Sequence, residues 1–206
     1  MTKQELGSIT AAIRDKMTEQ CDYLVALDAR NGDGDLGISM RECWSAVSEA
    51  VSAAETDDLG MILLECFKGA NRAAPSTRGT IMSFWMMGAA KALRGKTQAG
   101  VEEVADALLA GTSLISAKAG SKVGDKTVLD SIVPACEALK AHAAEGAAAA
   151  VSAAYAAAEE GMNSTKDMVS RHGRAAYYGE KSIGLIDGGA VAGKFIFEAV
   201  VPLYCR

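Results

Sequence analysis

The sequence lacks the features that mark membrane, secreted or nucleic-acid-binding proteins. No apolar run reaches the length of a membrane span, and the first residues show no signal-peptide pattern. The formal net charge is −5 and no basic run is present, whereas nucleic acids and anionic membranes are bound through clustered Lys and Arg. We therefore expect neither a nucleic-acid nor a membrane partner.

Cysteine and histidine offer no metal or redox pattern. The two histidines, His142 and His172, lie in different segments without metal-ligand spacing, and we expect them on the surface or in helix caps. The cysteines are odd in number, widely spaced and without a CxxC pair, which indicates reduced thiols in a cytoplasmic protein. They are Cys21, Cys43, Cys66, Cys136 and Cys205.

Proline and aromatic residues are scarce, and no convincing β-strand pattern is present. Three prolines and 5% aromatic residues accompany many Ala, Leu, Met, Glu and Lys, a composition that favours helix. Thr2 and Glu5 form a capping-box pattern, and residues 141–160 are mostly alanine, which suits a closely packed helix. We predict one all-α domain spanning residues 1–206. Apolar residues recur at helical spacing, as in the stripe Met40, Trp44, Val47 and Val51.

The most informative segment is an acidic, glycine-rich turn. Asp28, Asp33 and Asp35 fall within eight residues and are interleaved with glycines. Carboxylates this close repel one another unless a cation lies among them, and hard ions such as Mg²⁺ or Ca²⁺ prefer oxygen ligands. A helical pattern starts directly afterwards, at Leu36, and the free N–H groups and dipole of a helix N-terminus attract anions. Together these features predict a site for a metal ion and phosphate.

Two other interpretations of this turn stay open. Segments rich in Gly, Asp and Asn are often plain loops between helices. The turn also resembles an EF-hand calcium loop, whose sixth place, however, needs a glycine for the sharp turn and here holds Leu36. The first, third, fifth and twelfth places of that loop would be Asn31, Asp33, Asp35 and Glu42.

Three further segments interrupt the helical pattern. Residues 71–80 place hydroxyl groups and Arg78 at the head of a helix, either as a second phosphate site or as an ordinary helix cap. Residues 118–127 form a polar turn before another helix. Residues 173–190 make a long loop with Arg174 as a candidate anion ligand, and the aromatic residues and isoleucines of this loop argue that it is ordered.

Four segments, taken in order, match one known family. They are Asp28…Gly32-Asp33-Gly34-Asp35…Met40, then Ser76–Ser83, then Gly124-Asp125-Lys126-Thr127…Asp130, and last Gly173-Arg174-Ala175…Gly179-Glu180-Lys181-Ser182-Ile183-Gly184…Asp187…Gly189-Ala190. This ordered set closely resembles the nucleotide-binding (L) subunit or domain of dihydroxyacetone kinases, over nearly the whole chain. The resemblance implies an antiparallel barrel of about eight helices with a nucleotide site at one end.

The resemblance also implies which residues form the site. Asp28, Asp33 and Asp35 would hold two Mg²⁺ ions that bridge the phosphates of ATP or ADP, and Arg174 would complete the catalytic group. Val128, with Gly120 nearby, would line the adenine pocket. The residues implied to contact the nucleotide are Leu36, Gly37, Ile38, Ser39, Ser76, Thr77, Arg78, Gly120, Val128, Arg174, Asp187, Gly188 and Gly189.

Partners follow from the same resemblance. The family's carbonyl substrate is bound covalently by a histidine of a separate K-type subunit or domain. The resemblance therefore implies a kinase component that acts on an alcohol group only when this partner is present. A phosphocarrier subunit that recharges bound ADP is a further candidate partner.

One segment and three single residues depart from the family pattern and leave the donor and substrate open. Pro75-Ser76-Thr77-Arg78 replaces a glycine-rich turn, and Leu36 stands where phosphotransferase-linked members tend to have histidine. Val128 replaces a methionine and Gly188 a proline. The substrate could be dihydroxyacetone, a tetrulose or, through an acyl-carrier partner, a fatty acid. The alternative from another class is a non-catalytic, calcium-binding helical module.

Overall fold

Nine α-helices account for most of the described chain. The structure is a computed structural model and describes residues 1–205, apart from the side chains of Thr77 and Arg78. No β-strand occurs among these residues, which confirms the all-α class. The α-helices are α1 (Lys3–Glu19), α2 (Cys21–Asp28), α3 (Leu36–Ala53), α4 (Leu59–Ala73), α5 (Thr77–Ala92), α6 (Val101–Ala119), α7 (Leu129–Ala141), α8 (Ala147–Ser164) and α9 (Gly188–Tyr204); the short 3₁₀ helices are η1 (Ala143–Glu145), η2 (Thr165–Asp167) and η3 (Arg174–Ser182).

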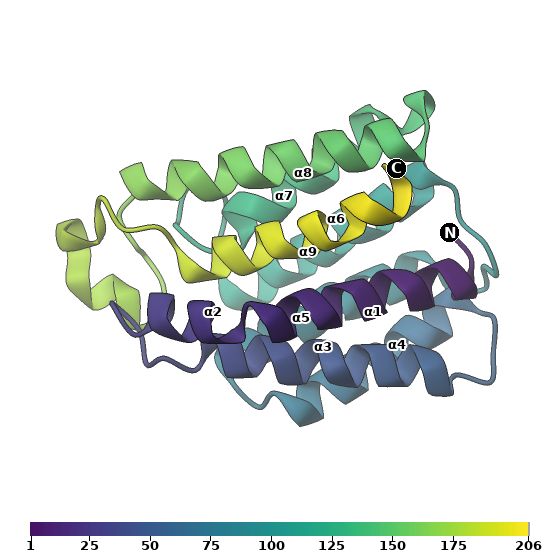
Figure 1. Ribbon diagram of the computed structural model, residues 1–206, viewed down its shortest axis with the longest axis horizontal. Helices are drawn as coiled ribbons and strands as arrows, with labels where there is room; N and C mark the ends of the chain where they lie inside the picture. Colours follow the sequence, from purple (N-terminus) through teal and green to yellow (C-terminus); the bar gives the residue numbers. More distant parts are fainter. Residues whose placement is uncertain (206) are drawn as a thin grey trace.

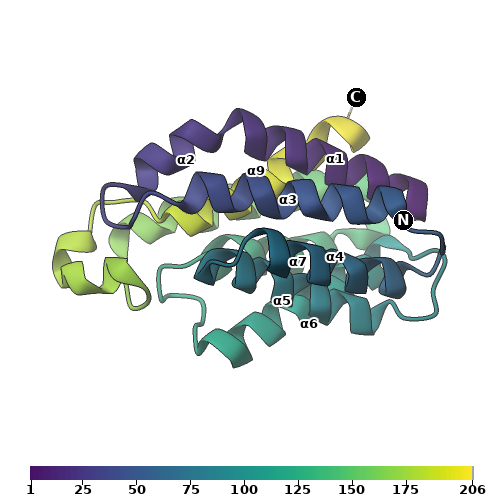
Figure 2. The ribbon, with the colours of Figure 1, turned by 90° about the horizontal axis from the view of Figure 1, so that it is seen from below.

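The helices run alternately in opposite directions around a closed ring (Figures 1 and 2). Each helix from α3 to α8 packs on the next one in the chain, and α1 closes the ring by packing on both α3 and α9. The short α2 continues α1 after Gln20. This arrangement confirms the predicted antiparallel barrel. It also brings the starts of α3, α5, α7 and α9 to the same end as η3 and the end of α2 (Figures 1 and 2).

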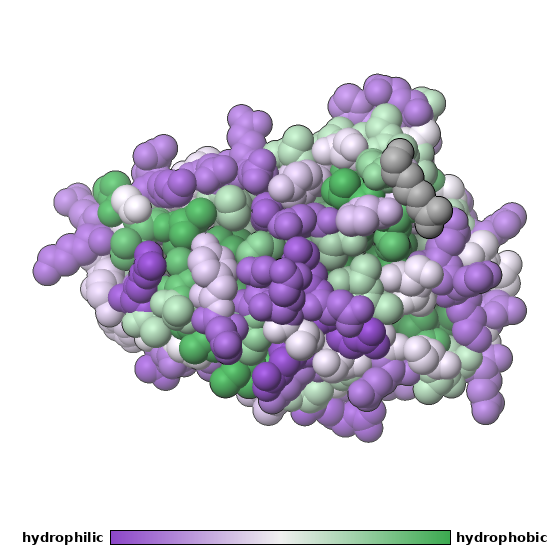
Figure 3. Space-filling model, in the orientation of Figure 1, coloured by the Kyte–Doolittle hydropathy of each residue, from purple (hydrophilic) through white to green (hydrophobic). Residues whose placement is uncertain are grey.

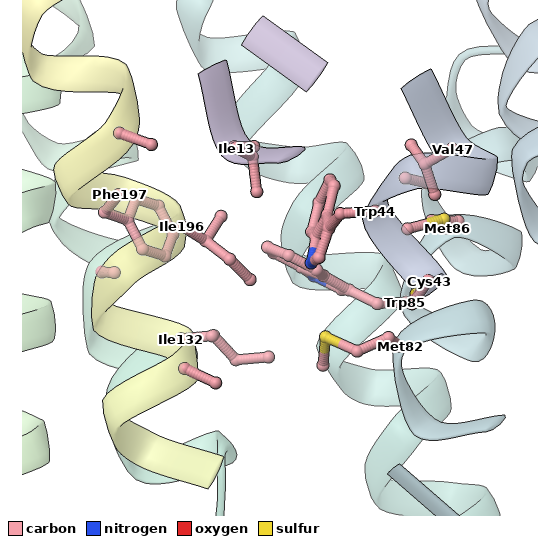
Figure 4. Close-up of a cluster of buried hydrophobic side chains, with 14 of the residues drawn as sticks. Ile13, Cys43, Trp44, Val47, Met82, Trp85, Met86, Ile132, Ile196 and Phe197 are labelled. Carbon is pink, nitrogen blue, oxygen red and sulfur yellow. The ribbon is translucent and has the colours of Figure 1, made fainter. Parts of the chain in front are cut away.

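The interior of the barrel is apolar. Figure 4 shows Trp44 and Trp85 close together, facing Ile196 and Phe197 across the interior. An apolar cavity of about 230 Å³ lies between these residues. Trp85 Nε1 donates to the carbonyl of Leu108 at 3.0 Å, whereas the buried Trp44 Nε1 has no hydrogen-bond partner among the described residues.

Local signals at the helix ends agree with the sequence. The capping box at Thr2 and Glu5 is formed, and Asp58 caps α4 by accepting a hydrogen bond from the backbone of Met61 at 3.0 Å. Glycine lets α5 and α6 approach closely, since a Cβ at Gly88 would lie 2.5 Å from the Cα of Gly111. Within the described range, none of the helices has both the length and the apolar character needed to span a membrane.

Candidate functional site

The acidic turn is wrapped tightly around Asp28, the last residue of α2. Its buried carboxylate accepts a hydrogen bond from the backbone N–H of Gly34 at 2.9 Å, and its carbonyl accepts one from Gly32 at 2.6 Å. Gly34 has φ +74°, and a Cβ at Gly32 would lie 2.2 Å from Asp28 Oδ1. Both glycines are therefore required by the turn itself.

The turn brings three carboxylates together at the end of the barrel. One oxygen from each of Asp28, Asp33 and Asp35 lies within 4.8 Å of the others. Opposite ligands of one Mg²⁺ ion lie about 4 Å apart, and carboxylate oxygens are the donors this ion prefers, so the cluster suits a hard divalent cation. Glu42 is exposed on α3 and is not part of the group, which disfavours the EF-hand interpretation.

The starts of α3 and α5 lie beside this cluster. Leu36, Gly37 and Ser39 are buried in the first turn of α3, whereas Ile38 is exposed. Ser39 Oγ lies 2.9 Å from Ser76 Oγ, which joins α3 to the cap of α5. The predicted contacts of the Thr77 and Arg78 side chains lie outside the described residues. The structure thus places two helix N-termini, with their free N–H groups, on one side of the acidic turn.

The starts of α7 and α9 supply two more helix N-termini. A Cβ at Gly188 would lie 2.7 Å from Leu36 Cδ2, and one at Gly189 would lie 3.2 Å from the backbone nitrogen of Val128. Asp187 caps α9 by accepting a hydrogen bond from the backbone of Ala190 at 2.7 Å. The two glycines therefore let α9 begin close to both α3 and α7.

Gly120 is the most peripheral of the predicted residues. It ends α6 with φ +65° and is exposed. Its neighbour Ser121 is linked to Thr127 by a 3.2 Å contact between the two hydroxyls, which connects this helix end to the turn before Val128. Gly120 and Val128 therefore flank the two residues, Ser121 and Thr127, whose hydroxyls are in contact.

Arg174 reaches the acidic cluster from η3. Its Nε lies 3.0 Å from Asp33 Oδ2, and its side chain is 67% exposed. This exposure leaves the guanidinium accessible to a ligand that enters from solvent. The structure thus places a cation against a carboxylate of the acidic cluster, on a segment more than 130 residues away in the chain.

The sequence did not predict the polar contacts that hold η3 on the barrel. These contacts, made by Lys126, Met168, Ser170 and Ser182, are called the polar base. Lys126 is buried, and its Nζ donates to the carbonyls of Met168 and Ser182 at 3.1 and 2.5 Å. Burial lowers the pKa of Lys126, against the opposite effect of nearby Asp187 and Asp167. The Gly-Asp-Lys-Thr match was the only available signal for this residue.

His172 lies beside this polar base. It lies 3.1 Å from the carboxylate of Asp125. A hydrogen bond from the backbone of Lys122 lowers the pKa of Asp125, and His172 adds to this effect. The expectation of a surface or cap histidine missed this contact.

Comparisons with known proteins identify similar chains. A family model described as the DAK2 domain matches residues 30–202. The ADP-binding subunit DhaL of a PEP-dependent dihydroxyacetone kinase from Escherichia coli is 30% identical over 186 residues, which cover 89% of each chain. The L-erythrulose 1-kinase of Mycolicibacterium smegmatis is 31% identical over 176 residues, covering 84% of this chain but 31% of that relative.

A solved structure has the same fold. The crystal structure of the dihydroxyacetone kinase from C. freundii in complex with AMP-PNP and Mg²⁺ superposes with a TM-score of 0.77 at 21% identity. The match covers 97% of this chain and 34% of that one.

Proposed function

Because this chain belongs to the DAK2 domain family, we propose that it is the nucleotide-binding component of a kinase for dihydroxyacetone or a similar small keto sugar. The observation that supports this function best is the joint position of the three aspartates, Arg174 and four helix N-termini at one end of the barrel. Carboxylates that hold cations, next to N–H groups that attract anions, suit a metal-bound polyphosphate. The barrel would act as one nucleotide-binding domain.

Each part of the site has a proposed role. Asp28, Asp33 and Asp35 would hold two Mg²⁺ ions, which when bound neutralise phosphate charge. The N–H groups of residues 36–39, with Ser76, would orient the phosphates, and Arg174 would stabilise charge on the transferred group. Thr77 and Arg78 would contact the phosphates from α5. Val128, Gly120, Asp187, Gly188 and Gly189 would border the rest of the nucleotide.

The substrate would arrive on a partner, the K-type subunit, at this same end. Phosphoryl transfer needs the reacting atoms to be about 3–3.5 Å apart, so the partner must cover the site. The segment that carries Arg174 exposes apolar side chains: Tyr177 is 92%, Tyr178 44% and Ile183 50% exposed. Figure 3 shows apolar residues among hydrophilic ones toward this end of the molecule. We assign the contact with the partner to the exposed surface formed by Tyr177, Tyr178 and Ile183, which is called the rim.

The phosphate donor and the sugar are the open parts of the proposal. Leu36 in place of histidine favours free exchange of ADP for ATP over recharging by a phosphocarrier. The likeness to an L-erythrulose 1-kinase makes a tetrulose the second candidate substrate. The cytoplasmic location expected from the cysteine pattern stays a prediction.

The test is a reconstitution with purified proteins. The chain is incubated with Mg-ATP and either dihydroxyacetone or L-erythrulose, with and without a K-type subunit, and the sugar phosphate is measured. We expect product only when the subunit is present. Rapid phosphorylation by the chain alone would contradict the need for a partner, and absence of product with every K-type subunit encoded beside it would contradict the function.

The same assay tests whether the rim contacts the K-type subunit and whether ATP is the phosphate donor. Tyr177→Asp should raise the concentration of K-type subunit needed for half-maximal rate while leaving Mg-ADP binding unchanged, whereas Tyr23→Asp, at an exposed tyrosine on α2, serves as the control. Replacing ATP by phosphoenolpyruvate and phosphocarrier proteins should give no product. A higher rate with the carriers than with ATP would reverse the assignment of the donor.

A further inference from the structure

Lys126 has a backbone conformation and a burial that are unusual for lysine. Among the described residues it is the only non-glycine with positive φ, at 64°, and it is 3% exposed. Such a conformation is strained for a side chain with a Cβ, and burial of an ammonium group is costly unless hydrogen bonds compensate. Lys126 thus combines a strained backbone with a buried charge, which indicates that the position of its ammonium group is important for the structure around it.

The ammonium group joins Met168 and Ser182, which flank the segment that carries Arg174; this segment, residues 169–181, is called the loop. Its hydrogen bonds go to Met168, before the loop, and to Ser182, the last residue of η3. One side chain on a different element thus closes the base of the loop. Its Nζ donates to these protein carbonyls and is buried, so it is not placed as a phosphate ligand.

Further hydrogen bonds join the same parts of the chain. Ser182 Oγ accepts a hydrogen bond from the backbone of Ser170 at 2.9 Å and donates to the carbonyl of Gly179 at 2.6 Å. The backbone of Gly184 donates to the carbonyl of Lys166 at 2.7 Å. Above the base, the tyrosines of η3 are exposed, so apolar packing does little to hold the loop.

The turn that carries Lys126 is itself fixed by α7. The buried carboxylate of Asp130 accepts hydrogen bonds from the backbones of Gly124 and Thr127, each at 2.6 Å. The barrel therefore fixes the turn, the turn directs Lys126, and Lys126 holds the loop. Arg174 stands at the far end of this sequence of contacts, 3.0 Å from Asp33.

We propose that Lys126 is a positioning residue that, by holding the carbonyls of Met168 and Ser182 together, places Arg174 at the phosphate site. This role rests on the proposed nucleotide-binding function. It also predicts that Lys126 acts through Arg174, so that once Arg174 is removed the loss of Lys126 has little further effect on nucleotide binding.

A double-mutant cycle tests this dependence. The dissociation constant of Mg-AMP-PNP, which carries the third phosphate on which Arg174 is proposed to act, is measured by calorimetry for the wild type, Lys126→Met, Arg174→Ala and the double variant. Loss of a residue that supports a ligand-contacting group costs about 10–100-fold in affinity, and we expect each single variant to show a loss in this range. The double variant should bind no more weakly than Arg174→Ala, because the two changes remove one effect.

Controls separate positioning from general damage. Lys122→Met alters an exposed lysine in the same turn and should leave the affinity unchanged. Limited trypsin digestion should cut Lys126→Met faster than the wild type at Arg171, Arg174 and Lys181, while the barrel helices stay protected. Ser182→Ala loosens the same base without touching Lys126, and it should reproduce the loss of affinity if Lys126→Met does not fold.

The possible outcomes are distinct. Affinity losses that multiply in the double variant, or wild-type affinity in folded Lys126→Met, would overturn the positioning role and leave the proposed function intact. If Lys126→Met does not fold, wild-type affinity in Ser182→Ala would overturn it in the same way. A wild-type protein that binds neither Mg-ADP nor Mg-AMP-PNP would overturn the proposed function and this role with it.

Discussion

The interior of the barrel and its functional end are built on different principles. The interior is apolar, and its side chains come from all the helices of the ring. The end of the barrel that carries the candidate site is polar, and individual hydrogen bonds hold its turns, such as those of Asp28 and Lys126. The interior should therefore determine the free energy of unfolding, and the end should determine ligand affinity, with little overlap between the two.

The largest effect should come from the interior. Ile62 is fully buried on α4, and replacing a buried Ile by Ala costs about 2–5 kcal/mol. Ile62→Ala should lower the free energy of unfolding by that amount in a urea titration, while the folded fraction binds Mg-ADP normally. The neighbouring Met61, 44% exposed, provides the control Met61→Ala, which should change stability little. A loss of affinity in folded Ile62→Ala would show that the two regions are coupled.

The functional end should show the reverse pattern. Asp33 is an exposed member of the acidic cluster and a proposed metal ligand. Its removal should weaken Mg-ADP binding by at least about 100-fold, since the loss of residues that only support a metal ligand costs 10–100-fold. Helicity and the unfolding midpoint of Asp33→Ala should stay near wild type. Asp57→Ala, at the opposite end of α4 from the site, is the matched control. Equal affinities of the two variants would remove Asp33 from the site.

The last prediction concerns the pH dependence of stability, which depends on buried groups of the interior. Burial raises the pKa of the Cys43 and Cys66 thiols to about 12 from 9.0. Between these values the unfolded thiols ionise while the folded ones stay protonated, so unfolding releases protons and stability falls as pH rises. Each thiol should contribute a decrease of about 1.4 kcal/mol per pH unit in this range. Cys66→Ala should flatten the profile measured from pH 9 to 11, and an unchanged slope would contradict the assignment.

The sequence predicted the interior well because burial there repeats at helical spacing. All four residues of the stripe Met40, Trp44, Val47 and Val51 are buried as expected. The composition and the resemblance together gave the all-α barrel. The acidic turn was predicted because its three aspartates are local, so that no long-range packing was needed to bring them together.

The sequence was least informative where distant segments meet. Residues 173–190 were expected to form one long ordered loop. The segment is ordered, but residues 174–182 form η3 and α9 begins at Gly188. Tyr177 is almost fully exposed, and polar contacts of Lys126 and Ser182 hold the segment. Lys126 with its positive φ gives no periodic pattern in the sequence. Its partners are backbone carbonyls, which every residue has, so the residue types at 168 and 182 do not reveal the contact. The pairing of Arg174 with Asp33 likewise depends on how the barrel closes.

The most direct test of the site is the magnesium dependence of nucleotide binding. ADP is titrated into the purified protein by calorimetry, once with Mg²⁺ and once with excess chelator. If the three aspartates bind the phosphates through cations, ADP binds with Mg²⁺ and its affinity falls by at least about 100-fold without it. Equal affinity under both conditions would contradict the account.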